Sequence, residues 1–253
     1  MTFPVACAPA RSIRDYEREY LASDFEAVQA RMRKRMLLSL LQKVRARRIL
    51  EVGCGTESMF SHWRRFDRFV IVEPGPEFAA RARSGAGNDT RISVVEDFIE
   101  TAGRGLEGER FDVILVSGLL HEVPDPVEVL RVVRALCHQE TLVHANVPNA
   151  RSLHRLLALE MGLIRDLHEI SERQLALSQP RTFDLSMLRA LCARCGFDEI
   201  PSGSYFVKPF SHSQMAQLHN AGMVNERMLH GLNGLERHLP GLGSEIFINL
   251  RRA

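Results

Sequence analysis

Two glutamates beside a glycine-containing loop are the residues best placed to hold a ligand. Glu51 lies within the apolar run of residues 49–52, two positions before Gly53-Cys54-Gly55, and Glu73 closes a second apolar run at residues 69–72. A buried carboxylate is costly unless a cation or a hydrogen-bond donor meets it, and the ammonium group of a ligand would meet Glu51. A carboxylate at the end of a strand, such as Glu73, can accept hydrogen bonds from both hydroxyls of a ribose. This spacing predicts a site for a nucleoside-containing ligand with a positively charged group.

The loop glycines and the residues after a third apolar run also favour a nucleotide site. Glycine allows backbone conformations and a close ligand approach that a Cβ would obstruct. Asp97 and Phe98 follow residues 92–95 and offer an acceptor and an aromatic edge to a purine. Several kinds of nucleotide-binding protein share the two-glycine pattern. A dinucleotide-dependent oxidoreductase would have glycine or alanine at Ser58 and an apolar residue at Glu51, so both positions argue against that class.

Short apolar runs alternate with helical segments in the part of the chain that must position these residues. Strands are expected at residues 48–52, 69–72, 92–95, 111–116 and 140–146, with helices at residues 58–65, 77–83, 98–102 and 126–137 between them. A helix at residues 183–195 and strands at residues 197–207 and 245–250 are expected to follow. Such alternation builds a parallel sheet with helices on both faces. The predicted fold is a Rossmann-like, doubly wound α/β sheet of seven mostly parallel strands with helical cap insertions.

Helical segments outside this alternation predict a cap over the ligand site. Apolar residues recur at three- and four-residue steps over residues 12–45, a helical pair is expected over residues 152–179, and residues 209–243 are mostly helical. We therefore expect four parts, which are an N-terminal helical cap (1–46), a ligand-binding core (47–148), a helical insertion over the substrate (149–182) and a C-terminal part of the core (183–253) with an insertion at about 209–243.

Residues 48–148 resemble the class I S-adenosylmethionine-dependent methyltransferases, in particular the branch that includes ubiquinone-biosynthesis enzymes and relatives from polysaccharide clusters. The resemblance implies S-adenosylmethionine as the cofactor. The binding residues it implies are Glu51 for the amino group, Gly53 and Gly55 for the loop, Glu73 and Pro74 for the ribose, Asp97 and Phe98 for adenine, and Ser117 and Gly118 beneath the methionine and adenine portions. One position departs from the family pattern, because Glu57 replaces the third loop glycine. A carboxylate suits the first turn of a helix but would lie near the carboxylate of the cofactor.

Catalysis in such a family depends on placing a nucleophile about 3 Å from the methyl group of a sulfonium, which supplies much of the acceleration. A base is also needed where the acceptor is a hydroxyl, because its proton must leave. His121 and Glu122, in the loop after the fourth strand, are the catalytic candidates. Many relatives have the order Glu-His here, so neither role follows from position. His121 could instead pack against the cofactor or cap a helix.

The methyl acceptor is expected to lie beside the segment that follows the fifth strand. Residues 146–155, 181–184 and 208–209 resemble methyltransferases from polysaccharide and natural-product clusters, and the arginines could hold a phosphate or carboxylate. The acceptor-binding residues expected on this basis are Asn149, Arg151, His154, Arg155, Tyr205 and Lys208. The alternative is that Asn149 caps a helix, the arginines lie on the surface and Tyr205 fills the core.

Composition limits the classes of partner. The chain of 253 residues has a formal net charge of +2, which does not demand a nucleic acid or an acidic membrane. No apolar run approaches the length of a membrane span, and residues 1–10 do not read as a signal peptide, so we expect a soluble cytoplasmic protein. Five scattered cysteines argue against a disulfide framework. Cys192 and Cys195 read as a packed pair rather than a metal site, and no metal is expected.

The main hypothesis is a methyltransferase that modifies an oxygen, or a nitrogen, of a small-molecule acceptor such as a sugar or a natural-product intermediate. The protein could also form a homodimer. Hydrophobic insertions fit a closed pocket better than a groove for a polymer. A methyltransferase for RNA, DNA or protein is the second hypothesis, although Ser117-Gly118-Leu119-Leu120 lacks the residues that clamp a flipped base. The third is a cofactor-binding protein without catalytic activity.

Overall fold

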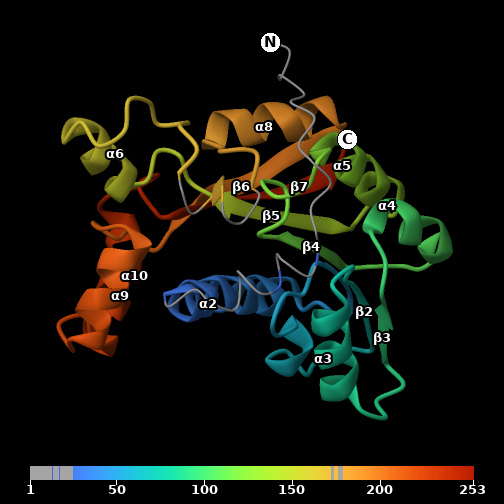
Figure 1. The fold of residues 1–253 in the computed structure, drawn as a ribbon. Coiled ribbons are helices and arrows are strands. Elements are labelled where there is room, and N and C mark those ends of the chain that lie inside the picture. Colours follow the sequence, from blue (N-terminus) through green and yellow to red (C-terminus); the bar gives the residue numbers. More distant parts are fainter. Residues whose placement is uncertain (1–12, 14–16, 18–24, 172–173, 176–178) are drawn as a thin grey trace.

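A seven-stranded sheet forms the centre of the computed structural model, which describes residues 13, 17, 25–171, 174–175 and 179–253 (Figure 1). The strands are β1 (Arg48–Val52), β2 (Arg68–Val72), β3 (Ile92–Val95), β4 (Val113–Ser117), β5 (Leu142–Pro148), β6 (Phe197–Tyr205) and β7 (Glu245–Arg252). Their order is β3-β2-β1-β4-β5-β7-β6. Strands β1 to β5 pair in parallel, and β7 is antiparallel to both β5 and β6. The predicted Rossmann-like sheet is therefore confirmed.

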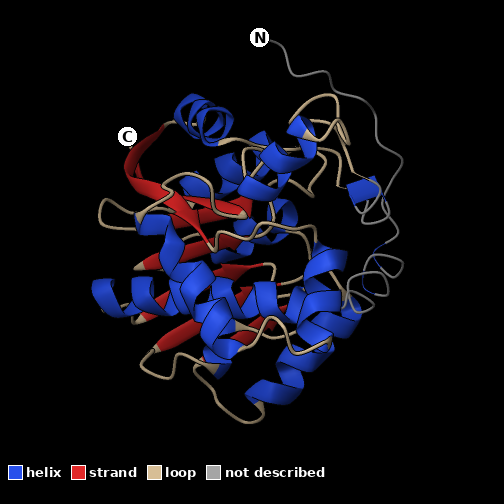
Figure 2. Cartoon of the chain, turned by 90° about the vertical axis from the view of Figure 1, so that its left-hand side faces the viewer, coloured by secondary structure: helices blue, strands red, loops and turns tan. Residues whose placement is uncertain are grey.

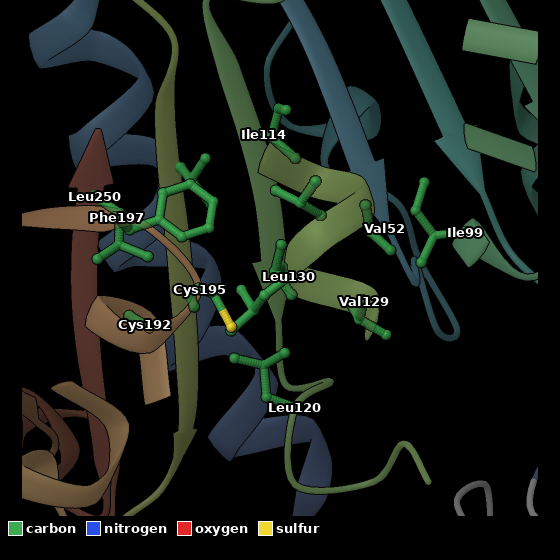
Figure 3. Close-up of a cluster of buried hydrophobic side chains, with 14 of the residues drawn as sticks. Val52, Ile99, Ile114, Leu120, Val129, Leu130, Cys192, Cys195, Phe197 and Leu250 are labelled. Atoms are coloured by element: carbon green, nitrogen blue, oxygen red, sulfur yellow. The ribbon is translucent and has the colours of Figure 1, made fainter. Parts of the chain in front are cut away.

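Helices cover both faces of the sheet, because the central strands are apolar on both sides (Figure 2). One face carries α2 (Glu26–Val44), the turn η1 (Met59–Ser61) and α3 (Pro76–Ala86), which pack on the side chains of Ile71 and Leu115. The other carries α4 (Ile99–Ala102), the turn η2 (Gly103–Leu106), α5 (Pro126–Ala135) and α8 (Leu185–Arg194). Figure 3 shows this second cluster, in which Leu130 of α5 and Cys192 of α8 meet Ile114 and Leu250 of the sheet.

The remaining helices gather at one end of the sheet. They are α6 (Leu153–Glu160), α9 (His212–Asn220), α10 (Glu226–Gly234) and the turn η3 (Leu235–Arg237). Figure 1 shows α6, α9 and α10 on the left, beyond the end of α2. A separate apolar cluster joins α2 to this group through Val28 and Met32, which pack with Phe206, Met215 and Leu229. These helices thus lie at the end of the sheet where the ligand site is predicted.

Two expected helices differ from the structure. The helix expected over residues 58–65 is only the turn η1, because Trp63 donates its indole N–H to the Ala46 carbonyl at 3.0 Å and packs in the core, and this tertiary contact overrides the local pattern. The helical pair expected over residues 152–179 is represented in the described residues by α6, a loop and the helical residues Gln174 and Leu175. Helix α6 ends near Gly162, whose φ of 69° a helix does not accommodate. Part of the expected pair, and most of residues 12–24, lies outside the described residues.

Several side chains outside the ligand site have structural roles. The Asp125 side chain caps α5 by accepting from the backbone N–H groups of Val127 and Glu128. Cys192 and Cys195 are buried free thiols, and burial raises the pKa of Cys192 to about 12, as for an inert packed pair. Within the described ranges, no helix is long and apolar enough to cross a membrane, and no group of His, Cys, Asp or Glu has the arrangement of a metal site.

Candidate active site

A cavity of about 480 Å³ opens at the carboxyl ends of β1, β2, β4 and β5 and is closed by residues of α2 and α6. It lies where the strand order reverses between β1 and β4, which is where open α/β sheets bind ligands. The volume falls in the range of pockets that enclose small molecules.

The loop after β1 gives this cavity a floor that only glycine can form. Gly53 and Gly55 have φ angles of 77° and 55°, a region that other residues rarely adopt. A Cβ on Gly53 would lie 3.7 Å from Leu119, whereas a Cβ on Gly55 would meet no atom within 4 Å. Because Gly55 lines the cavity, a side chain there would enter the space available to a ligand.

Glu51 is held at the bottom of the cavity with only 5% of its surface exposed. Its carboxylate accepts a hydrogen bond from the Ser58 hydroxyl and another from the Met59 backbone N–H at 3.1 Å. Burial raises the pKa of Glu51 to about 7, and these two hydrogen bonds oppose the rise only in part. The carboxylate would therefore be stabilised by a ligand that brings a positive charge.

Glu73 lies beside Glu51 in the cavity wall and is anchored by backbone groups. Its carboxylate accepts from the N–H groups of Cys54 at 2.9 Å, Gly55 at 3.2 Å and Gly75 at 2.8 Å. Burial raises the pKa of Glu73, and the three N–H groups oppose this rise. A carboxylate fixed in this way at the end of β2 can accept further hydrogen bonds from ligand hydroxyls.

A further carboxylate, Glu17, supports this corner of the site and was not predicted. It accepts from the backbone N–H groups of Glu77 at 2.9 Å and Phe78 at 3.1 Å, at the start of α3. A Cβ on Gly75 would come within 2.6 Å of its oxygen, so the glycine permits the close approach. Nothing in the local sequence marks Glu17, because the contact joins residues about sixty positions apart.

Glu57, the residue that replaces the third loop glycine, turns toward α2. Its carboxylate pairs with the Lys34 ammonium and lies 3.1 Å from Nε2 of His62. The hydrogen bond from Lys34 lowers the pKa of Glu57. Both Glu57 and Lys34 line the cavity, so this pair fastens α2 to the loop that carries Gly53 and Gly55.

A buried ion pair joins α2 to the sheet on the other side of β4. Arg33 donates to both carboxylate oxygens of Glu245 at 2.6 and 3.1 Å, and Gln29, Asn146 and Tyr205 also donate to this carboxylate. The Arg33 charge and these donors lower the pKa of Glu245 against the effect of its burial. The sequence did not reveal this network, since its members come from α2, β5, β6 and β7.

His121 and Glu122 are both buried and line the cavity after β4. Nε2 of His121 lies 3.5 Å from a Glu122 oxygen, and the same oxygen accepts a hydrogen bond from Gln179 at 2.8 Å. Gln179 thus orients the carboxylate that faces the imidazole. The arrangement places a carboxylate where it can stabilise a protonated imidazole.

Comparison with known proteins agrees with this geometry. A family model described as a methyltransferase domain matches residues 21–200. The chain belongs to the class I S-adenosylmethionine-dependent methyltransferases. No curated protein matches it. Its structure is similar to a possible histamine N-methyltransferase from Thermotoga maritima, with 18% identity over 95% of this chain and 96% of that chain and a TM-score of 0.58.

Two further solved structures show the same methyltransferase fold with S-adenosylhomocysteine bound. The plantazolicin methyltransferase BamL is 12% identical over 95% of this chain and 97% of that chain, with a TM-score of 0.57. The N-methyltransferase NodS from Bradyrhizobium japonicum WM9 is 12% identical over 91% of this chain and 98% of that chain, with a TM-score of 0.52. S-adenosylmethionine is therefore the cofactor of this methyltransferase family member.

The residues of this methyltransferase fit that cofactor. Glu51 is a buried carboxylate that lacks a full counter-charge, and the space above Gly55 is open to a ligand. The predicted cofactor residues in the cavity lining are Glu51, Gly53, Gly55, Glu73, Pro74, Phe98, Ser117 and Gly118. Asp97 lies outside the lining and its carboxylate accepts from the Phe98 N–H at 2.7 Å. Glu100, which was not predicted, lines the cavity instead.

The predicted acceptor residues of the methyltransferase divide into two groups. Those in the cavity lining are Asn149, His154, Arg155 and Lys208. Arg151 is exposed and lies outside the lining, and Tyr205 is buried in the Glu245 network. Asn149 also has a structural role, because its amide donates to the carbonyls of Gly241 and Gly243 at 2.9 and 2.8 Å. His212, which was not among the predicted acceptor residues, also lines the cavity.

Proposed function

We propose that this enzyme transfers a methyl group to an oxygen, or to a nitrogen, of a small-molecule acceptor such as a sugar or a natural-product intermediate. The observation that supports this most is that the His121–Glu122 pair and the carboxylates Glu51 and Glu73 line one cavity. A cavity of about 480 Å³ suits a cofactor and a small acceptor better than a polymer.

The proposed mechanism assigns separate tasks to the two sides of the cavity. When bound, the cofactor supplies a methyl group on a sulfonium. Glu51 holds an ammonium group, Glu73 holds hydroxyls, and the glycines leave room for both contacts. On the other side, the imidazole of His121 takes the proton of the acceptor hydroxyl, while Glu122 stabilises the imidazolium that forms. Gln179 keeps Glu122 in place.

We also propose that helical segments outside the core act as a cap over the acceptor. These are residues 1–46, the insertion 149–182 and the insertion at about 209–243. In support, side chains of α2, of α6 and of the segment between β6 and α9 line the cavity. Removing water from the site would strengthen the contacts that hold the acceptor.

The acceptor atom is the less constrained part of the proposal. The NodS and Thermotoga proteins are named as N-methyltransferases, which is consistent with a nitrogen acceptor. An unprotonated amine needs no base, whereas a hydroxyl does. The buried His121–Glu122 pair therefore favours an oxygen.

Binding and label transfer test the proposal. Calorimetry with S-adenosylhomocysteine should show saturable binding, and its absence would remove the methyltransferase function. The enzyme should then transfer a labelled methyl group from S-adenosylmethionine to members of a panel of small hydroxylated and amino compounds. Labelling of RNA or protein alone would favour a macromolecular acceptor, and cofactor binding without transfer to any class would favour the non-catalytic alternative.

A histidine substitution tests the base. Replacing His121 by Asn should lower kcat by about 100- to 10,000-fold for a hydroxyl acceptor, the usual contribution of a general base, without changing cofactor affinity. His230, an exposed residue of α10, provides the matched control His230→Asn. An unchanged kcat across the pH range for His121→Asn would assign that residue a structural role.

A further inference from the structure

Cationic and basic side chains gather at the end of the cavity opposite Glu51 and Glu73. Lys208 lies just beyond β6, His212 begins α9, and His154 and Arg155 belong to α6, and all four line the cavity. Lys208 is only 1% exposed. Placing an ammonium group in the interior is costly, so a buried lysine at the wall of a cavity marks a position where charge is used.

The contacts of Lys208 fix the direction of its ammonium group. Nζ lies 3.1 Å from Nδ1 of His212, 3.5 Å from the Phe210 carbonyl oxygen and 5.9 Å from the centre of the Phe25 ring. The other ring nitrogen of His212, Nε2, lies 3.6 Å from a Glu26 oxygen. The imidazole of His212 thus helps to position the lysine.

The pKa of His154 reflects the positive charge at the end of the cavity that carries Lys208. Burial lowers the pKa of His154 well below its usual value, and Lys208, His212 and Arg155 lower it further. The charged groups with a resolved effect on this imidazole are thus all cationic. The Nδ1 atom of His154 is buried and has no hydrogen-bond partner among the described residues.

Among the described residues, the acidic groups Glu245 and Glu26 near this end both pair with Arg33. The Glu245 carboxylate is surrounded by Arg33, Gln29, Asn146 and Tyr205, and Glu26 lies 3.5 Å from Arg33 as well as beside His212. Arg155 donates to the carbonyls of Leu167 and Glu169, and the acidic residues of the loop 166–169 lie near its guanidinium. Arg155 therefore contributes less positive charge to this end of the cavity than Lys208 does.

We propose that Lys208, together with His154 and His212, binds an anionic group of the methyl acceptor, either a carboxylate or a phosphate. The proposal rests on the proposed function, in which this cavity holds a small acceptor. The sheet order places the group on the far side of β4 from the cofactor carboxylates, since α6 follows β5 and Lys208 follows β6. An anion is attracted to the end that carries Lys208 and repelled from the end that carries Glu51 and Glu73. The acceptor would therefore enter in one orientation, with its nucleophile toward His121.

The test uses the full-length protein saturated with S-adenosylhomocysteine. Inorganic phosphate and acetate are titrated separately at constant ionic strength maintained with chloride, and binding is followed by calorimetry. The ring signals of His154 are recorded by NMR in the same titrations. We expect saturable binding of one or both anions and an upward shift of the His154 pKa when the anion is bound. Tighter binding of acetate would indicate a carboxylate on the acceptor, and tighter binding of phosphate a phosphate.

Two variants locate the anion. Lys208→Met should weaken anion binding by about tenfold or more, the effect of losing one charge-assisted hydrogen bond. Arg151→Gln, an exposed arginine of the neighbouring segment, should change it by less than about twofold. S-adenosylhomocysteine affinity should stay constant in both variants. Should Lys208→Met fail to fold, the His154 signal of the natural protein still decides the matter.

The outcomes separate this proposal from the proposed function. Failure to bind S-adenosylhomocysteine would overturn the function itself. The anionic acceptor site alone would be overturned if S-adenosylhomocysteine binds normally but no anion binds saturably. It would also be overturned if an anion binds, Lys208→Met leaves that binding unchanged and the His154 signal does not follow it.

Discussion

Substituting Glu51 by Gln should make the ligand-free protein more stable and the cofactor complex weaker. Glutamine keeps the size of the side chain and can still accept from Met59 while its amide donates to the Ser58 oxygen. It removes only the ability to ionise. The substitution thus isolates the energetic effect of a buried negative charge that, in the predicted site, is compensated when the ammonium group of the cofactor binds.

The size of the effect follows from the pKa of Glu51. Burial raises that pKa from 4.5 in the unfolded chain to about 7 in the folded protein. At about 1.4 kcal/mol per pKa unit, ionisation of the folded protein costs about 3 kcal/mol of stability. Because the folded pKa is the higher one, this stability is fully present below pH 4.5 and is lost as the pH rises to about 7. The variant should therefore match the natural protein near pH 4.5 and exceed it by up to about 3 kcal/mol at pH 8.

Denaturation by urea at a series of pH values, with and without S-adenosylhomocysteine, measures both effects. Without ligand, the advantage of Glu51→Gln at pH 8 corresponds to a melting temperature about 6–12 °C higher. With ligand, its affinity should be roughly 10- to 150-fold lower than that of the natural protein, the effect of losing a hydrogen bond between charged groups. Glu107→Gln, at an exposed glutamate before β4, is the control. A stability difference that is the same at pH 5 and pH 8 would refute the buried charge, and unchanged affinity would refute the contact with the ammonium group.

Three further substitutions test other parts of the site. Gly55→Val and Gly87→Val both place a branched residue at a φ near 55° with no atom within 4 Å of the new Cβ. Both variants should therefore lose about 1–2 kcal/mol of stability in urea denaturation. Only Gly55→Val should also lose S-adenosylhomocysteine binding, measured by calorimetry. Glu57→Gln removes a carboxylate beside the predicted position of the cofactor carboxylate, so binding should strengthen about two- to fivefold at low salt and this gain should fade at high salt. Glu245→Gln should cost about 3–5 kcal/mol in thermal unfolding because it removes the negative charge that faces Arg33 within a buried network, whereas Glu226→Gln, which breaks the exposed ion pair between α10 and Arg31 of α2, should cost less than about 1 kcal/mol.

The fold was predictable because its strands carry the signal locally. Continuous apolar runs, each ending in a glycine, an acid or a polar turn, mark the parallel strands from the sequence alone. The prediction for the cofactor loop has the same basis, since Glu51, Gly53 and Gly55 are neighbours in the chain and Glu73 closes the adjacent strand. Local signals fail where a distant contact decides the structure, as where Trp63 bonds to Ala46 and the expected helix shortens to a turn.

The acceptor end was less predictable for a related reason. Its groups come from segments far apart in the chain, and no short spacing unites Lys208 with His154 or Glu245 with Arg33. His212 was not predicted as a site residue, because a single histidine at the start of a helix has no sequence pattern of its own. The arginines of the segment after β5 gave an ambiguous signal, and the structure places Arg155 in the cavity lining and Arg151 on the surface. Burial and direction, which decide such roles, arise only when the sheet brings the segments together.

The distribution of charge in the cavity bears on the choice between oxygen and nitrogen as the acceptor atom. Glu51, Glu73 and Glu100 make one end acidic, and Lys208 with Arg155 makes the other basic. A protonated amine would be drawn toward the acidic end, where it would compete with the ammonium group of the cofactor and would lack the lone pair needed for attack. A hydroxyl stays neutral and can face His121 while an anionic group on the same molecule lies near Lys208. Since a hydroxyl must lose its proton and His121 lies between the two ends beside Glu122, the charge pattern favours an oxygen nucleophile on an anionic molecule.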